Sequence, residues 1–412
     1  MAPAAPTAED ERIGTRLAGR YELRRVVADG GMGRVYEGID KQTDSRIAVK
    51  MLHADVARDE VALERFKREY EINAKLPHEH IVKVLGFERD PISQMWILIM
   101  EFLDGEELRY VLKREKTLPP ERLVRMLSQV AIGLDEAHGR GFIHRDLKPD
   151  NLFLCGTREG DIVKLLDFGS VKDTATSNQK KLTVLGTTIG SPYYMAPEQA
   201  QGLETIDSRA DVFALAAVVY ECITGEVPFG GTNGPSILLA ILTKDAEPPT
   251  SKASKVKHPI PPAMDEVLEV ALTKNPAIRT KSVGALADAV GAAYGLTGDH
   301  RQWALVPQQD LAATIAEAMP RIMAAKVAPL GVAGDPFAAG NVVGDPFAAP
   351  GAGAMPVGDL TTAPRTLGAP DSSDFRPQGV PGGKPGWMLP VIVGVLALLV
   401  GGAVTLFVMM GR

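Results

Sequence analysis

The alternation of apolar and polar positions along the chain indicates one long globular region. Residues 13–296 switch repeatedly between strand-like and helix-like patterns. Strand formers occupy residues 21–27 and 34–38 on either side of a Gly-rich turn, and residues 96–100 form a continuous apolar run. Residues 64–72 show instead the charged pattern of a helix with a solvated face. This pattern predicts a folded region that combines strands with helices.

The segments on either side of this region follow other patterns. We expect residues 1–20 to form an N-terminal tail, whereas residues 297–330 are ambiguous. Within the second segment, apolar residues recur every four positions, at Leu311, Ile315 and Met319. This spacing predicts one short amphipathic helix that ends before Pro320, because proline breaks the hydrogen bonding of a helix interior.

Residues 331–386 have the composition of a flexible linker. These 56 residues include 12 Gly and 9 Pro. A segment of this composition cannot bury enough apolar surface to offset the conformational entropy lost on ordering the chain. The linker contains a repeated Gly-Asp-Pro-Phe-Ala-Ala segment, within residues 332–339 and 342–349. Two short copies are too few for a solenoid. They are either a neutral duplication or a docking peptide with Phe337 and Phe347 as exposed anchors.

The chain then becomes apolar throughout. Residues 388–410 are 23 consecutive residues without a charged side chain. As a helix they would extend about 35 Å, more than the hydrocarbon core of about 30 Å. Trp387 stands at the near edge, where amphipathic rings favour the membrane interface. The sequence therefore predicts a transmembrane helix over residues 387–410, a single-pass C-terminal anchor; a buried core helix is the alternative.

Small residues recur within the predicted membrane helix. Ala397, Gly401 and Thr405 lie four positions apart and share one face of the helix. Small residues at this spacing let two membrane helices approach closely, so a homodimer is possible. The other reading is that Gly and Ala are simply common in membrane helices.

Composition excludes several classes of protein. The chain has 412 residues, of which 45% are apolar, so it can bury a sizeable core and is not disordered throughout. Cys155 and Cys222 are its only cysteines, which excludes a disulfide framework and indicates a reducing compartment. The net charge of −6 argues against nucleic acid as a partner, since phosphate binding needs a basic surplus.

Five short motifs carry groups suited to phosphate chemistry. A Gly-rich turn between strands lets backbone N–H groups approach phosphate oxygens, and an apolar strand with one lysine follows it. Further along come His-Arg-Asp with Asn five residues after the Asp, then Asp-Phe-Gly, then Ala-Pro-Glu. In chain order these motifs lie in residues 27–36, 47–50, 143–153, 167–169 and 190–198.

Five motifs in this order make the chain resemble the protein kinase family over residues 21–296. The sequence Gly-Gly-Met-Gly-x-Val-Tyr and the predicted membrane anchor resemble those of the bacterial eukaryotic-like (Hanks-type) serine/threonine kinases. The resemblance implies an α+β, bilobal fold, with a small β-rich N-lobe and a larger, mostly helical C-lobe. It implies ATP and Mg²⁺ as cofactors and proteins with Ser or Thr hydroxyls as substrates. Because ATP is cytosolic, we expect the kinase domain in the cytoplasm and the chain in the membrane.

The resemblance also implies roles for individual residues. The catalytic residues would be Asp146 as proton acceptor, Lys148 steadying the phosphoryl group, and Lys50 held by Glu69. Asn151 and Asp167 would hold Mg²⁺. Nucleotide would contact Val27, Ala28, Asp29, Gly30, Gly31, Met32, Gly33, Arg34, Val35, Ala48, Lys50, Met100, Glu101, Leu103 and Phe153. Two residues would support the fold around this site: Asp211 beneath the His-Arg-Asp motif of residues 143–153, here called the catalytic loop, and Arg279 paired with Glu198.

Arg145, next to the catalytic Asp146, implies control by phosphorylation of the activation loop, because a phosphate would pair with its guanidinium. The candidate phosphate acceptors are Thr183, Thr187 and Thr188. Thr174, Thr176 and Ser177 are secondary candidates. The lysine at position 148, two residues after Asp146, is similar to the pattern of the Ser/Thr kinases of this family and not to that of the Tyr kinases.

Three positions depart from the family pattern: Ala28, Ser191 and Ala216 stand where the family usually has Gly, Thr and Gly. Ala28 is tolerable if its φ stays negative. None of the three removes a catalytic group. The alternative function is a pseudokinase scaffold that binds nucleotide or partners without phosphotransfer. The presence of Lys50, Asp146 and Asp167 argues against it.

Overall fold

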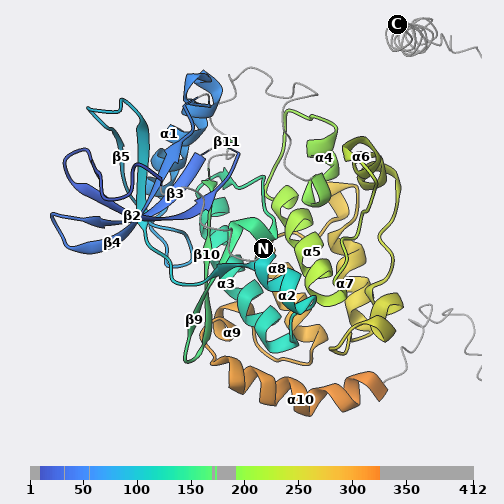
Figure 1. The fold of residues 1–412 in the computed structure, drawn as a ribbon. Helices are drawn as coiled ribbons and strands as arrows, with labels where there is room; N and C mark the ends of the chain where they lie inside the picture. Colours follow the sequence, from blue (N-terminus) through green and yellow to red (C-terminus); the bar gives the residue numbers. More distant parts are fainter. Residues whose placement is uncertain (1–9, 32, 55, 169–171, 174–191, 325–412) are drawn as a thin grey trace, which may run out of the picture. The chain divides into compact units, whose positions relative to one another are not determined.

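The computed structural model describes residues 10–31, 33–54, 56–168, 172–173 and 192–324. The described part has two lobes, one rich in strands and one rich in helices (Figure 1). The expected bilobal α+β architecture is therefore present, while the predicted linker of residues 331–386 and the predicted membrane helix of residues 387–410 lie outside the described residues.

The N-lobe is built on one antiparallel sheet with the strand order β1-β2-β3-β4-β6-β5. Helix α1 (Glu60–Lys75) and the short 3₁₀ helix η1 (Val56–Arg58) follow β4. The strands are β1 (Arg16–Leu17), β2 (Tyr21–Asp29), β3 (Gly33–Asp40), β4 (Ser45–Leu52), β5 (Val84–Arg89) and β6 (Trp96–Glu101).

The side chains of β4 alternate between two small cores. Ile47, Val49 and Met51 pack with Ile97 and Ile99 of β6 on one face of the sheet. Leu52 and Leu98 pack with Phe66 of α1 on the other face. Because successive side chains of a strand point to opposite faces, Lys50 lies on the α1 face. The lysine of an apolar strand is thereby directed at a helix and not at solvent.

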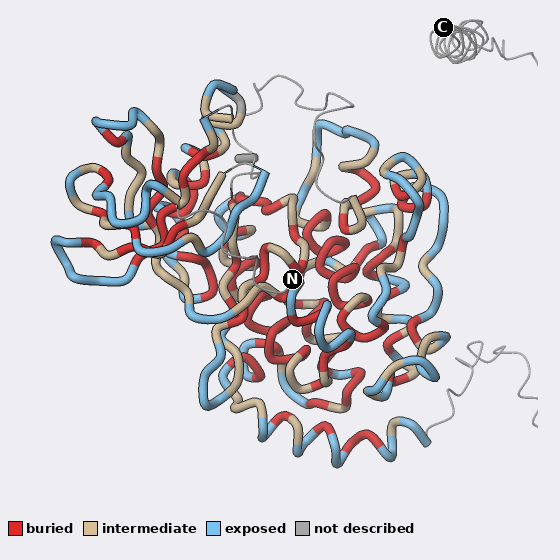
Figure 2. Tube along the Cα trace, viewed as in Figure 1, coloured by how far each residue is buried: buried red, intermediate tan, exposed pale blue. Residues whose placement is uncertain are grey.

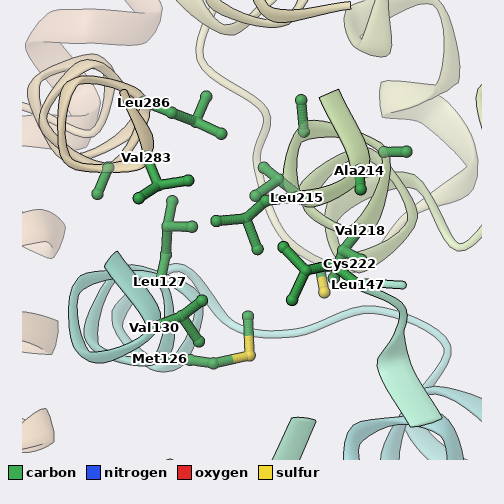
Figure 3. Close-up of a cluster of buried hydrophobic side chains, with 14 of the residues drawn as sticks. Met126, Leu127, Val130, Leu147, Ala214, Leu215, Val218, Cys222, Val283 and Leu286 are labelled. Atoms are coloured by element: carbon green, nitrogen blue, oxygen red, sulfur yellow. The ribbon is translucent and has the colours of Figure 1, made fainter. Parts of the chain in front are cut away.

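Figure 3 shows the core of the C-lobe, where three helices meet. They are α3 (Pro120–Gly139), α5 (Arg209–Thr224) and α8 (Val283–Ala293). Nearly every residue of α5 is buried, and the tube in Figure 2 is accordingly red along this helix. An apolar surface all round a helix requires neighbours on several sides, and α3 and α8 are among the elements that pack against α5.

The remaining elements complete the C-lobe. Its other helices are α2 (Leu108–Glu115), α4 (Pro197–Ala200), α6 (Gly234–Thr243) and α7 (Ala263–Ala271), with the 3₁₀ helices η2 (Pro149–Asn151), η4 (Pro192–Tyr194), η5 (Pro249–Lys255) and η6 (Pro276–Ile278). Two small sheets hold β7 (Glu106–Glu107), β9 (Leu152–Thr157) and β10 (Gly160–Leu165), and β8 (Phe142–Ile143) with β11 (Lys172–Asp173).

The N-terminal boundary differs from the sequence prediction. Residues 16–17 form β1 against β2, and the backbone N–H of Ala18 donates to Asp90 at 2.7 Å. Leu17 is buried in the N-lobe core. Burial of this one apolar side chain explains why part of the expected tail belongs to the sheet.

The ambiguous segment after residue 296 is helical. It forms α9 (His300–Trp303) and α10 (Gln308–Ala324), and Leu311, Ile315 and Met319 are buried as their spacing predicts. The helix does not end before Pro320, as expected, but continues to Ala324. Side chains from both sides of the proline, Ala318 and Ile322, pack against Gly295. These contacts offset the backbone hydrogen bond that a proline removes.

The described residues contain no helix long and apolar enough to cross a membrane.

Replacement of Trp303 tests whether the C-terminal extension is part of the folding unit. Trp303 is buried, and a Cβ placed on Gly291 would lie 2.0 Å from its ring, so the indole packs directly on α8. We expect Trp303→Ala to lower the free energy of unfolding by about 3–5 kcal/mol. The neighbouring Leu305 is 75% exposed, and Leu305→Ala should change it by about 0.5 kcal/mol or less. Urea unfolding measures both free energies. If Trp303→Ala had an effect as small as the one expected for Leu305→Ala, the extension would not stabilise the domain.

Candidate active site

An ion pair joins β4 to α1. Lys50 Nζ lies 2.8 Å from Glu69 Oε2, and both side chains are largely buried. Burial alone would lower the pKa of Lys50, but the negative charges of Glu69 and Asp167 outweigh it and raise the pKa. The lysine therefore stays charged at neutral pH. The structure thus pairs Lys50 with Glu69, and the negative charge of Asp167 also acts on Lys50.

The catalytic loop places two of the expected residues, Lys148 and Asn151, beside the carboxylate of a third, Asp146. Lys148 Nζ lies 2.7 Å from Asp146 Oδ2. Asn151 Nδ2 donates to the backbone carbonyl of Asp146 at 2.6 Å and to its carboxylate at 3.3 Å. This bond fixes the amide of Asn151 through its nitrogen, which leaves the amide oxygen as the atom available to a cation.

The catalytic loop is tied to the segment that carries Asp167. The backbone N–H of Leu166 donates to the carbonyl of Asn151 at 2.9 Å. His144 contacts the Leu166 carbonyl through Nε2 at 3.0 Å, and its ring meets Phe168 edge-on. Asp167 has a φ of 58°, a left-handed conformation that is uncommon outside Gly and clusters at functional sites. An amide and a carboxylate, both oxygen donors suited to Mg²⁺, are thus fixed in adjoining segments.

Asp211 lies beneath the catalytic loop. Its buried carboxylate accepts hydrogen bonds from the backbone N–H groups of His144 and Arg145, both at 2.8 Å, and from His138 Nε2 at 2.7 Å. Burial would raise the pKa of Asp211, but the hydrogen bond from His138 and the nearby charges lower it. The sequence analysis missed His138, because a single histidine in a helix gives no signal of its own.

The residues predicted to contact nucleotide come from both lobes. Ala48 and Met100 are neighbours across β4 and β6. Phe153 lies on β9 and is paired with Lys164 of β10, whose ammonium group reaches Glu101 Oε1 at 2.7 Å. Lys164 was not predicted as a site residue, since a lysine near the end of a strand usually faces solvent.

The Gly-rich turn connects β2 to β3. Val27, Ala28 and Asp29 end β2, and Arg34 and Val35 belong to β3. Ala28 does not have a positive φ, so it meets the condition under which alanine is tolerated.

Within the turn, Gly30 donates its N–H to the Gly33 carbonyl at 3.0 Å. A Cβ on Gly33 would lie 2.2 Å from the carbonyl oxygen of Met51, so only glycine fits there. Gly31 has open space beside it. Met32 lies outside the described residues.

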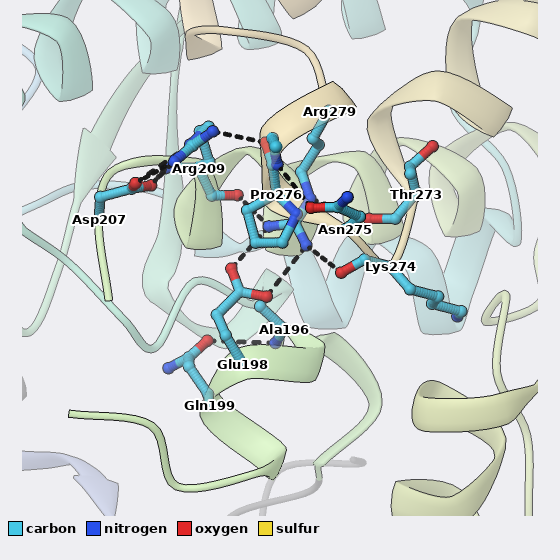
Figure 4. Close-up of polar contacts among 11 residues, drawn as sticks. Ala196, Glu198, Gln199, Asp207, Arg209, Thr273, Lys274, Asn275, Pro276 and Arg279 are labelled. Atoms are coloured by element: carbon cyan, nitrogen blue, oxygen red, sulfur yellow. Dashed lines mark hydrogen bonds and ion pairs between the residues drawn. The ribbon is translucent and has the colours of Figure 1, made fainter. Parts of the chain in front are cut away.

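A second buried ion pair holds the C-lobe together (Figure 4). Arg279 donates to both carboxylate oxygens of Glu198, at 2.7 and 3.0 Å. The same guanidinium donates to the backbone carbonyls of Thr273, Lys274 and Arg209. These hydrogen bonds offset the free-energy cost of removing the charged guanidinium from water. The pair anchors α4 to the segment around η6.

Arg145 differs from these paired charges. It has a φ of 66°, and its side chain donates to the Ile206 carbonyl at 3.2 Å. Its buried Nε has no hydrogen-bond partner among the described residues. Burial lowers the pKa of the guanidinium. Thr183, Thr187, Thr188 and Ser191 lie outside the described residues, as do Thr174, Thr176 and Ser177.

Comparison with known proteins identifies the class to which this fold and site belong. Residues 21–289 match the family Pkinase, described as the protein kinase domain. The chain belongs to the protein kinase family.

Its relatives are bacterial. It is 37% identical over 278 residues to the serine/threonine-protein kinase pkn3 of Myxococcus xanthus, covering 67% of this chain and 50% of pkn3. It is 36% identical over 284 residues to PknA of Mycobacterium tuberculosis, covering 68% of this chain and 63% of PknA. The chain thus spans half to two thirds of the length of these curated relatives.

A solved structure shares the fold. The chain is similar to the kinase domain of Mycobacterium tuberculosis PknI, with a TM-score of 0.52 and 26% sequence identity. The similarity covers 68% of this chain and 97% of that domain.

Proposed function

We propose that this chain is an ATP-dependent serine/threonine protein kinase. The proposal rests mainly on one observation: the Lys50–Glu69 ion pair is formed, and Asp146 contacts both Lys148 and Asn151. Phosphoryl transfer needs chiefly positioning and charge stabilisation, and this arrangement offers both. The kinase names of its bacterial relatives support the same activity.

Each residue has a task in the proposed reaction. Lys50 binds the α- and β-phosphates, and Asn151 and Asp167 would hold Mg²⁺. ATP supplies the γ-phosphoryl group, and Mg²⁺ offsets its charge. Asp146 accepts the proton of the Ser or Thr hydroxyl. Lys148, 2.7 Å from that carboxylate, steadies the transferring group.

Replacement of Asp146 tests the reaction. Asp146→Asn keeps the shape but removes the proton acceptor, and we expect phosphotransfer to a Ser/Thr protein substrate to fall by about 10²–10⁴-fold. Asp150→Asn is the matched control, because Asp150 lies in the same loop but pairs with Arg109 at 3.2 Å; this variant should stay active. Retention of more than a few per cent of activity in Asp146→Asn would contradict the assigned role.

Wild-type protein decides between the kinase and the pseudokinase scaffold. The kinase transfers ³²P from ATP to protein in the presence of Mg²⁺. A folded wild-type protein that binds ATP and transfers none would favour the scaffold.

We further propose that phosphorylation of the activation loop controls activity through Arg145. Arg145 is half-buried, and its buried Nε has no hydrogen-bond partner among the described residues. An unpaired buried donor costs free energy, and a phosphate would supply an acceptor for it. The acceptors we propose are Thr183, Thr187 and Thr188, modified by the enzyme itself.

Phosphatase treatment tests this control. We expect it to lower wild-type activity about tenfold or more, because it removes the ligand that orders the loop. Arg145→Met should have low activity that phosphatase does not change, since the group that responds to the phosphate is gone. Mass spectrometry maps the sites. An Arg145→Met enzyme that still responds to phosphatase would place the control elsewhere.

We also propose that residues 387–410 anchor the kinase domain to the cytoplasmic side of a membrane and allow a homodimer. The uncharged run of residues 388–410 supports the anchor, and the small-residue face supports pairing.

Membrane fractionation and crosslinking test the anchor. Deletion of residues 387–412 should move the protein from the membrane pellet to the supernatant. Gly401→Ile should reduce the crosslinked dimer several-fold, whereas Gly402→Ile, on another face, should not. A deleted chain that stays in the pellet would contradict the anchor, and equal dimer in both variants would contradict pairing through this face.

A further inference from the structure

The N-terminal segment before β1 contacts the end of the Gly-rich turn. Asp10 is 26 residues from Tyr36 in sequence, yet the Tyr36 hydroxyl donates to Asp10 Oδ2 at 2.6 Å. Arg34 Nη1 donates to the same oxygen at 2.6 Å, and the backbone N–H of Arg12 donates to Asp10 Oδ1 at 3.0 Å. The Asp10 side chain is only 9% exposed. A carboxylate with three donors is held firmly in place.

Arg34 passes this constraint to the opposite limb of the turn. Its Nε donates to Asp29 Oδ2 at 2.8 Å, and its Nη2 contacts the same oxygen. Asp29 ends β2 and faces Arg34 across the strand pair. His53, just after β4, contacts Asp29 Oδ1 at 3.2 Å and the Gly30 carbonyl at 2.9 Å. The chain of contacts therefore runs from Asp10 through both limbs of the turn.

We propose that Asp10 is a positioning residue for the Gly-rich turn, so that the segment before the first strand sets how tightly the phosphates of ATP are bound. The inference rests on the proposed function, in which this turn covers those phosphates. The turn itself contains Gly30 and Gly31, which have room where a side chain would be, and glycine has a large conformational freedom to lose. Side chains anchored outside the turn reduce that loss before the nucleotide arrives.

The same sheet offers a matched control at its far end. Asp40 accepts two hydrogen bonds from Arg20, at 2.7 and 2.6 Å, and its side chain is 7% exposed. Asp40 pairs with Tyr21, the first residue of β2, whereas Asp29 and Arg34 pair at the turn. Asp10→Asn and Asp40→Asn therefore remove the same charge from similar surroundings, but only the first lies beside the Gly-rich turn.

Binding measurements with the full chain test the proposal, with Mg·ATP and adenosine as the two probes. We expect Asp10→Asn to weaken Mg·ATP binding and raise KM for ATP about tenfold, the loss of roughly one charge-assisted interaction, with a smaller effect on kcat. Adenosine has no phosphates, so its Kd should not change. Asp40→Asn should leave both Kd values unchanged, although it lowers the melting temperature.

Several outcomes would overturn the proposal. Unchanged Mg·ATP binding in Asp10→Asn would do so, as would equal weakening of ATP and adenosine, which indicates a general structural effect. If Asp10→Asn does not fold, Tyr36→Phe replaces it: this variant removes one donor to Asp10 and should weaken Mg·ATP but not adenosine. Wild-type protein that fails to bind Mg·ATP would overturn the proposed function itself, a result distinct from failure of Asp10 alone.

Discussion

The buried carboxylate of Asp211 is the constraint on which the catalytic loop depends. It fixes two consecutive backbone N–H groups, those of His144 and Arg145, and Arg145 is held at a φ of 66°. A left-handed conformation costs a residue with a Cβ about 1–2 kcal/mol. Two hydrogen bonds to a charged acceptor contribute about 1.5–3 kcal/mol each, so they outweigh that cost. The orientation of Asp146, the next residue, follows from this balance.

The two lobes meet through segments that also carry site residues. The backbone of residues 80–82 bonds to Leu165 on both sides, at 2.8 and 3.0 Å, and Lys164 reaches Glu101. Strand β10 thus contacts the N-lobe immediately before the chain arrives at Asp167. Any shift of β10 would move Asp167 relative to Lys50, whose charge it influences. The joint between the lobes and the proposed metal ligand are therefore parts of one continuous segment.

Sequence reasoning succeeded where one residue type can meet a chemical need, and failed where packing decides. The resemblance to protein kinases predicted the Lys50–Glu69 and Arg279–Glu198 pairs and the place of Asp211 beneath the catalytic loop, and these contacts are present. The pattern could not reveal His138 or Lys164, whose partners lie 73 and 63 residues away. The end of α10 was also mispredicted: local propensity predicts a stop at Pro320, whereas contacts with Gly295 carry the helix further.

The buried charges of the site fall into two groups with different consequences. Glu69, Asp211 and Arg279 each have an ion-pair or hydrogen-bond partner within the described fold, so each is paired before any ligand binds. Arg145 Nε has none among the described residues. A buried donor without a partner costs free energy, so the fold would gain stability if Arg145 Nε found an acceptor. An anionic ligand at that point would remove the deficit, and stability and activity would then rise together.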